Sequence, residues 1–387
     1  MDQRTTKILF PLLRSAICGT KLTEDERRMY SSEILQELLK LSARHDISHL
    51  VVLGLKKNDL ISRENAGIEQ FIFKAAYRYE RMQYEYNNIC NALETAEIPF
   101  LPLKGSVLRN YYPEPWMRTS CDIDILVHHE DLERAISYLM DNMNYVLKKR
   151  SIHDVSLLSP IGIHLELHFD LVEEWRANNA PRILRSVWEN VQLHENSSCW
   201  YEMNDAFFYF YHIAHMAKHF EDGGCGIRPF IDLWILDYME NVDQSARTDL
   251  LSQGGLLKFA QVCHALNEVW FGNAEHDEMT IRMQNFLLHG GAYGSADNRV
   301  ALQQKNKGGR IGYIWSRIFV SREKLQRYYP VLVRHPWLLP VMQIRRWFLI
   351  FRPDIAKATK KELVTNANLD TSKADEMNDL LNDVGLG

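Results

Sequence analysis

The chain lacks closely spaced cysteines, and basic residues are not in excess. Its six cysteines stand at positions 18, 90, 121, 199, 225 and 263, and no two of them form a Cys-x-x-Cys pair. This spacing excludes zinc ribbons and thioredoxin-type redox motifs, and scattered cysteines in 387 residues are typical of free thiols in a reducing compartment. A net charge of −5 excludes a global basic field, so we do not expect a nucleic-acid partner.

From the sequence we expect neither a targeting segment nor a membrane-spanning segment. The N-terminus carries Asp2, Arg4 and Lys7 and has Pro11 inside its one short apolar run, so it does not read as a signal peptide. No run of about 18 uninterrupted apolar residues exists. We therefore expect a cytoplasmic protein without a spanning helix.

What the sequence does contain is a change of periodicity at Pro99. Residues 24–44 and 62–96 carry apolar side chains at helical spacing, whereas residues 121–127, 152–158 and 161–169 have strand character, with an amphipathic helix at 129–142. Strong helical patterns return from about residue 203. The predicted class is α+β. We expect an N-terminal helical segment (1–97), a core (98–200), a C-terminal helical region (201–365) and a flexible tail (366–387).

Three carboxylates in the core point to a metal site. Asp122 and Asp124 lie two positions apart on one strand, so both project from the same face and can share a divalent cation. Glu166 reaches them if its strand pairs beside the first, and three carboxylates repel one another without a cation. Mg²⁺ prefers such oxygen ligands together with phosphates and water. An Asp-x-Asp can also lie on a solvated strand face, but the preceding Gly105-Ser106 pair and Glu166 favour function.

These residues resemble the nucleotidyltransferases of the DNA polymerase β superfamily. The matching parts are Leu103-Lys104-Gly105-Ser106, Asp122-Ile123-Asp124 and Glu166. The chain is more closely similar to an uncharacterised bacterial nucleotidyltransferase family over roughly residues 60 to 240, through these runs and through Tyr112-Pro113, Arg118, His215, His219, Arg228 and Asp232. The resemblance implies a small mixed-sheet nucleotidyltransferase core between helical segments.

The resemblance also implies a reaction and roles. Asp122, Asp124 and Glu166 would be catalytic and would hold Mg²⁺ or Mn²⁺, with Glu166 as an alternative proton acceptor. The donor would be a nucleoside triphosphate, ATP by default, bound through Lys104, Gly105, Ser106 and Arg118. Such an enzyme moves NMP to a hydroxyl of a small molecule, sugar or protein and releases pyrophosphate, as in EC class 2.7.7.

Several polar residues in the second helical region allow two interpretations each. His212, His215 and His219 share a helix face, and they either touch the substrate or are packed beside the cleft. Arg228 and Asp232 are spaced for an ordinary helix ion pair, while the resemblance adds His215, His219 and Arg228 to the candidate binding residues.

Two other functions stay open, as does the role of the segment 330–352. The chain could be a nucleotide-binding or scaffold protein linked to polysaccharide assembly, or a toxin-like enzyme that modifies a protein. Residues 330–352 interleave tryptophan and arginine, a pattern that suits an anionic membrane surface. Because Pro330, Pro336 and Pro340 interrupt this segment and Pro353 follows it, we favour a helix-packing stripe there over membrane contact.

Overall fold

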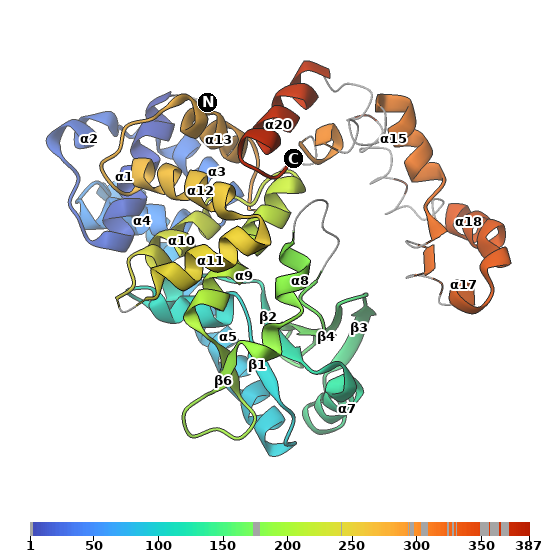
Figure 1. Ribbon diagram of the computed structural model, residues 1–387. Helices are drawn as coiled ribbons and strands as arrows, with labels where there is room; N and C mark the ends of the chain where they lie inside the picture. Colours follow the sequence, from blue (N-terminus) through green and yellow to red (C-terminus); the bar gives the residue numbers. More distant parts are fainter. Residues whose placement is uncertain are drawn as a thin grey trace.

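The computed structural model describes most of the chain: residues 3–172, 179–240, 242–292, 294, 298–302, 309–322, 325–326, 329, 331–348, 356, 364 and 371–387. Figure 1 shows a small sheet below a larger body of helices. This arrangement confirms the predicted α+β class. All six cysteines are free thiols, as the spacing predicted.

The N-terminal segment is helical, with one break that the sequence pattern did not predict. Its elements are α1 (Gln3–Cys18), α2 (Glu24–Met29), α3 (Leu35–Arg44), α4 (Ser48–Lys57), the 3₁₀ helix η1 (Arg63–Glu69) and α5 (Gln70–Thr95). The helix expected over 24–44 is divided because Thr23 and Glu26 form a capping box that begins α2, and extended backbone at Tyr30 ends it.

The core is a five-stranded mixed sheet. Its spatial order is β1 (Phe100–Pro102), β2 (Asp122–Val127), β5 (His164–His168), β4 (Asp154–Leu158) and β3 (Val146–Arg150). Strands β2 and β5 run parallel, and the other neighbours run antiparallel. Strand β3 was not predicted, because an exposed edge strand of Val-Leu-Lys-Lys-Arg buries too little to need apolar alternation.

Short elements connect these strands. Between β1 and β2 lie α6 (Gly105–Leu108) and the 3₁₀ helices η2 (Arg109–Tyr111) and η3 (Pro115–Met117). The 3₁₀ helix η4 (His129–Asp131) and α7 (Leu132–Met143) follow β2. After β5 come α8 (Ala180–Leu184), η5 (Val187–Glu189) and a second, two-stranded sheet of β6 (Val191–Leu193) and β7 (Tyr201–Met203).

The main sheet has one apolar face and one polar face. Ile123, Ile125 and Val127 of β2 form a hydrophobic core with side chains of β4, β5, α5 and α7. Because strand side chains alternate, Asp122 and Asp124 project from the opposite face. The polar face is therefore left for the site.

The second helical region contains α9 (Asp205–Glu221), α10 (Arg228–Asp237), α11 (Gln244–Gly254), α12 (Leu257–Trp270) and α13 (Glu278–His289). It shares one hydrophobic core with the N-terminal helices, for example where Phe10 of α1 stacks on Trp270 of α12 with ring centroids 4.2 Å apart. The two helical segments that flank the sheet in sequence thus pack against each other.

Further helices toward the C-terminus include α15 (Gly309–Ile318), α17 (Val331–Arg334), the 3₁₀ helix η6 (Pro336–Leu338), α18 (Leu339–Phe348) and α20 (Thr371–Asp383). The prediction of a flexible tail is wrong for α20. This helix packs against α13 through buried Met377 and Leu380 and through an Arg282–Asp383 ion pair of 2.7 Å. The sequence pattern did not predict this helix, because its few apolar residues stand among acidic ones. Among the described residues, none of the helices has the length and apolar character that crossing a bilayer requires.

Candidate functional site

The polar face of the sheet forms the floor of a cleft of about 460 Å³. Helices α9 and α10 supply the opposite wall. Every sequence-predicted site residue except Ser106 lines this cleft: Lys104, Gly105, Arg118, Asp122, Asp124, Glu166, His215, His219 and Arg228. The fold therefore brings together residues from three parts of the chain.

The carboxylates meet because of the strand register. Asp124 of β2 lies directly opposite Glu166 of the parallel strand β5, and Asp122 is two residues away on the same face. Asp124 is 4% exposed, whereas Glu166 is half-buried. The sequence could suggest this cluster but could not fix the pairing of β2 with β5, since the two strands are far apart along the chain.

Two cationic or ionisable groups hold Asp124. The Lys104 ammonium donates to Asp124 Oδ1 at 2.9 Å, and His168 Nε2 lies 2.9 Å from the same oxygen and 3.7 Å from Glu166 Oε2. Burial alone would raise the pKa of Asp124, but Lys104 and His168 outweigh it and hold that pKa well below its ordinary value. Asp124 therefore stays ionised.

The pKa values of the other two carboxylates are shifted upward instead. Burial, reinforced by the charge of Asp124, raises the pKa of Glu166 to about 7. The same two causes raise the pKa of Asp122. Glu166 and Asp122 therefore keep their protons more readily than free carboxyl groups do, as expected for acids buried beside a charged Asp124.

A divalent cation fits this donor set. Within the described part of the chain, the ligand atoms of Asp124, Glu166 and His168 all lie within 4.8 Å of one another. Carboxylate oxygens suit Mg²⁺ and Mn²⁺, and an imidazole nitrogen is compatible with Mn²⁺ as well as with later transition metals. Asp122 lies outside this closest group but on the same face.

The segment before the carboxylates has an unusual backbone. Lys104 adopts φ +45°, a left-handed conformation that a residue with a side chain seldom takes, directly before α6. A Cβ atom at Gly105 would lie 3.1 Å from Ser120 Cβ, so the glycine allows α6 to approach the loop that leads into β2. Ser106 is buried and does not line the cleft.

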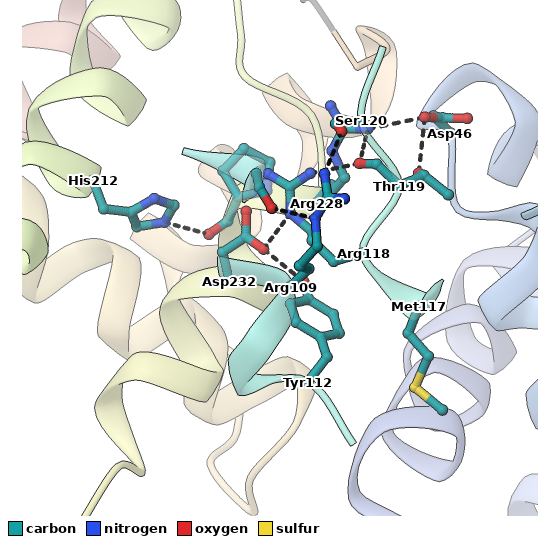
Figure 2. Close-up of polar contacts among 12 residues, drawn as sticks. Asp46, Arg109, Tyr112, Met117, Arg118, Thr119, Ser120, His212, Arg228 and Asp232 are labelled. Atoms are coloured by element: carbon teal, nitrogen blue, oxygen red, sulfur yellow. Dashed lines mark hydrogen bonds and ion pairs between the residues drawn. The ribbon is translucent and has the colours of Figure 1, made fainter. Parts of the chain in front are cut away.

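A network of buried charges fixes that loop (Figure 2). Arg118 Nε donates to Asp232 Oδ1 of α10 at 2.6 Å, and the Tyr112 hydroxyl donates to the same oxygen at 2.6 Å. Arg228 Nη1 donates to Asp46 Oδ2 at 2.9 Å rather than to Asp232. The suggested helix ion pair between Arg228 and Asp232 is therefore wrong, because each residue has a partner from another part of the chain.

The histidines of α9 form part of the cleft wall. His212 Nε2 lies 3.0 Å from the Pro229 carbonyl oxygen, and the Nε2 atoms of His215 and His219 are 3.1 Å apart. Burial lowers the pKa of all three, that of His219 to about 3, so they are neutral near pH 7. In a neutral pair at this distance, one ring donates its Nε2–H and the other ring accepts through an unprotonated Nε2.

Sequence reasoning missed several residues of the cleft. His168 could have been found, because it is two positions beyond Glu166 and must share its face in a strand. Tyr211 and Lys218 had no such signal, since their places depend on how α9 lies over the sheet. Burial, together with the charge of Lys104, lowers the pKa of Lys218 to about 8.

Comparison with known proteins identifies a family. A family model described as an uncharacterised nucleotidyltransferase matches residues 31–272, well over half of the chain. The matched part contains the sheet, the carboxylate cluster and the cleft wall of α9 and α10. No curated protein and no solved structure matches the chain.

Proposed function

The chain belongs to the family of uncharacterised nucleotidyltransferases, and from that premise we propose a metal-dependent transfer of NMP from a nucleoside triphosphate to a hydroxyl, with release of pyrophosphate. We also propose that the chain belongs to the DNA polymerase β superfamily and that it is a bacterial enzyme. The observation that carries it is the register of β2 and β5, which sets Asp124 opposite Glu166 with Asp122 on the same face.

We propose that Asp122, Asp124 and Glu166 hold Mg²⁺, with Mn²⁺ as an alternative. A bound divalent ion supplies positive charge for the triphosphate and for the in-line transition state. His168 orients Asp124 through its contact with Oδ1, as partners of metal ligands commonly do. Glu166 can instead accept the proton of the attacking hydroxyl, a role that suits a carboxyl with a pKa of about 7.

The cations of the cleft have different tasks in this proposal. Lys104 lies at Asp124 and can turn toward a phosphate oxygen, while Gly105 brings the backbone of α6 to the cleft. Arg118 is held by Asp232, so it contributes charge and fixes the loop. Arg228 lines the cleft and is held by Asp46 through Nη1, so its guanidinium faces a bound substrate from the wall of α10.

The proposed division of labour follows the division of the chain. The core 98–200 supplies the carboxylates, and the helical region 201–365 supplies the wall that faces the acceptor. The donor is ATP by default, and the acceptor is a hydroxyl of a small molecule, sugar or protein. The free thiols support a reducing, cytoplasmic site of action.

Calorimetry with the four nucleoside triphosphates, with and without Mg²⁺ or Mn²⁺, tests the proposal. We expect metal-dependent binding of one triphosphate to the wild type and loss of that binding in the variant Asp122→Asn/Asp124→Asn. Asp141→Asn, an exposed carboxylate on α7, is the matched control and should bind like the wild type. Binding that persists in the double variant, or that needs no metal, contradicts the proposal.

A further inference from the structure

Helix α18 has its apolar face turned toward solvent. Val341, Ile344 and Phe348 follow one another at spacings of three and four and are 52%, 48% and 67% exposed. The inward face is polar: Gln343 is buried and donates to the Val320 carbonyl oxygen, and Arg346 donates to the Arg317 carbonyl oxygen. A helix at the surface of a folded domain normally shows the opposite pattern.

Helix α15 presents a second exposed apolar face beside it. Ile311, Trp315 and Ile318 recur at helical spacing and are 72%, 57% and 41% exposed. Trp315 stacks on Phe319, and Phe319 in turn meets Trp347 of α18 with ring centroids 5.7 Å apart. The two helices are therefore joined, with apolar side chains exposed on both.

The connecting segment extends this surface. Val333 of α17 is 64% exposed and Trp337 of η6 is 72% exposed. Figure 1 shows α15, α17 and α18 together on one side of the molecule, away from the sheet. Single exposed apolar residues are ordinary, but this many on the four elements α15, α17, η6 and α18 mark an interaction surface. We call residues 309–348 the arginine–tryptophan segment.

The charge of this segment is opposite to that of the whole chain. It contains eight lysines and arginines and one acidic residue, Glu323, whereas the chain has a net charge of −5. Arg322, Arg334 and Arg345 are exposed. A second copy of the same surface would bring like charges together, and a nucleic acid offers phosphates but nothing for so many aliphatic and aromatic side chains.

The sequence favoured a helix-packing stripe here, but the apolar side chains of α15 and α18 face solvent, so we propose that the arginine–tryptophan segment lies on the surface of an anionic lipid bilayer. Its tryptophans and aliphatic side chains would enter the boundary between headgroups and acyl chains, and its arginines would contact lipid phosphates. The exposed apolar side chains then contact acyl chains, and the arginines contact lipid phosphates. The inference is independent of nucleotide transfer, because no residue of the cleft contributes to it.

Sedimentation of the full chain with vesicles tests this inference. We expect binding to vesicles of phosphatidylcholine and phosphatidylserine, little binding to phosphatidylcholine alone, and weaker binding as salt rises. Removing apolar side chains in Trp337→Ser/Ile344→Ser should lower the vesicle partition coefficient roughly tenfold or more. Removing charge in Arg334→Gln/Arg345→Gln should lower it by a similar factor and reduce the salt dependence.

Matched controls distinguish the segment from the rest of the surface. Phe73→Ser removes a side chain on α5 that is 71% exposed, nearly the same as Trp337, and Arg28→Gln removes an exposed charge on α2. Both should bind vesicles like the wild type, and circular dichroism should show every variant folded. Equal losses in the controls overturn the inference. So does a wild type that ignores anionic vesicles but forms a dimer, or binds duplex DNA, in a way that Trp337→Ser/Ile344→Ser abolishes.

Discussion

Replacing Asp232 with alanine should strongly destabilise the protein, because it removes the acceptor of a buried ion pair. The side chains of Arg118 and Asp232 are 8% and 1% exposed, and their N–O distance is 2.6 Å. Burial would raise the pKa of Asp232, but the Arg118 guanidinium outweighs it and holds that pKa below its ordinary value. The native structure therefore depends on a charged Asp232.

The magnitude follows from what remains after the substitution. An unpaired buried guanidinium costs about 3–5 kcal/mol, and the Tyr112 hydroxyl also loses its acceptor. Arg118 keeps one bond, from Nη1 to the Thr119 carbonyl oxygen, which moderates the loss. We expect Asp232→Ala to lower the free energy of unfolding by about 4 kcal/mol.

Urea unfolding followed by tryptophan fluorescence measures this change. Asp141→Ala, an exposed carboxylate on α7, is the control and should change the free energy of unfolding by about 0.5 kcal/mol or less. The double variant Arg118→Leu/Asp232→Leu should recover much of the loss, because it leaves no unpaired charge. A loss of less than about 1 kcal/mol of unfolding free energy in Asp232→Ala would refute the reasoning. So would a loss in the double variant that equals the sum of the losses in Arg118→Leu and in Asp232→Leu.

Three further substitutions test other parts of the structure. Gly54→Ala should cost about 3 kcal/mol in a urea titration, because its Cβ would overlap the backbone of α1, whereas Gly67→Ala meets open space and should be neutral. Burial, with a smaller effect of Arg44, lowers the pKa of His45 to about 4. The unfolded chain therefore binds more protons than the folded chain between pH 6.5 and 4, and the free energy of unfolding falls as the pH drops through that window. His45→Leu should remove about 3 kcal/mol of this fall, measured by urea unfolding at pH 7 and at pH 4. His168→Ala should weaken Mn²⁺ binding, measured by electron paramagnetic resonance, about 10- to 100-fold, and His168→Gln should weaken it less because the amide can still donate to Asp124.

Each of these three has a result that would contradict it. Equal stabilities of Gly54→Ala and Gly67→Ala would mean that α1 and α4 can separate without cost. An unchanged acid response of His45→Leu would assign the pH dependence to other groups. Unchanged Mn²⁺ affinity in both His168 variants would show that this imidazole neither binds nor positions a ligand of the metal.

Local patterns predicted the parts of this protein that depend on nearby residues. The alternation in Asp122–Val127 indicated β2 and its two faces, and the spacing of apolar residues indicated α9 and α10. Strand β3 escaped notice because its edge position leaves it exposed. The partners of Arg118 and Arg228 also escaped, since Asp232 and Asp46 are more than 100 residues away from them along the chain. Periodicity carries no information about such pairs.

The long-range charges lead to a last prediction about how the chain is divided. Arg228 of α10 donates both to Asp46 of the N-terminal segment and to the Thr119 carbonyl oxygen of the core, so one side chain joins all three regions. Without its neighbours, the core 98–200 would expose the buried network and the floor of the cleft to water. We therefore expect residues 98–200 alone to be unfolded by circular dichroism and proton NMR, and residues 1–292 to fold, because they include every partner of that network. A folded isolated core with dispersed amide signals would contradict this prediction. It would show that the sheet is stable without α5 and the other helices, and that the buried charges serve substrate binding rather than the fold.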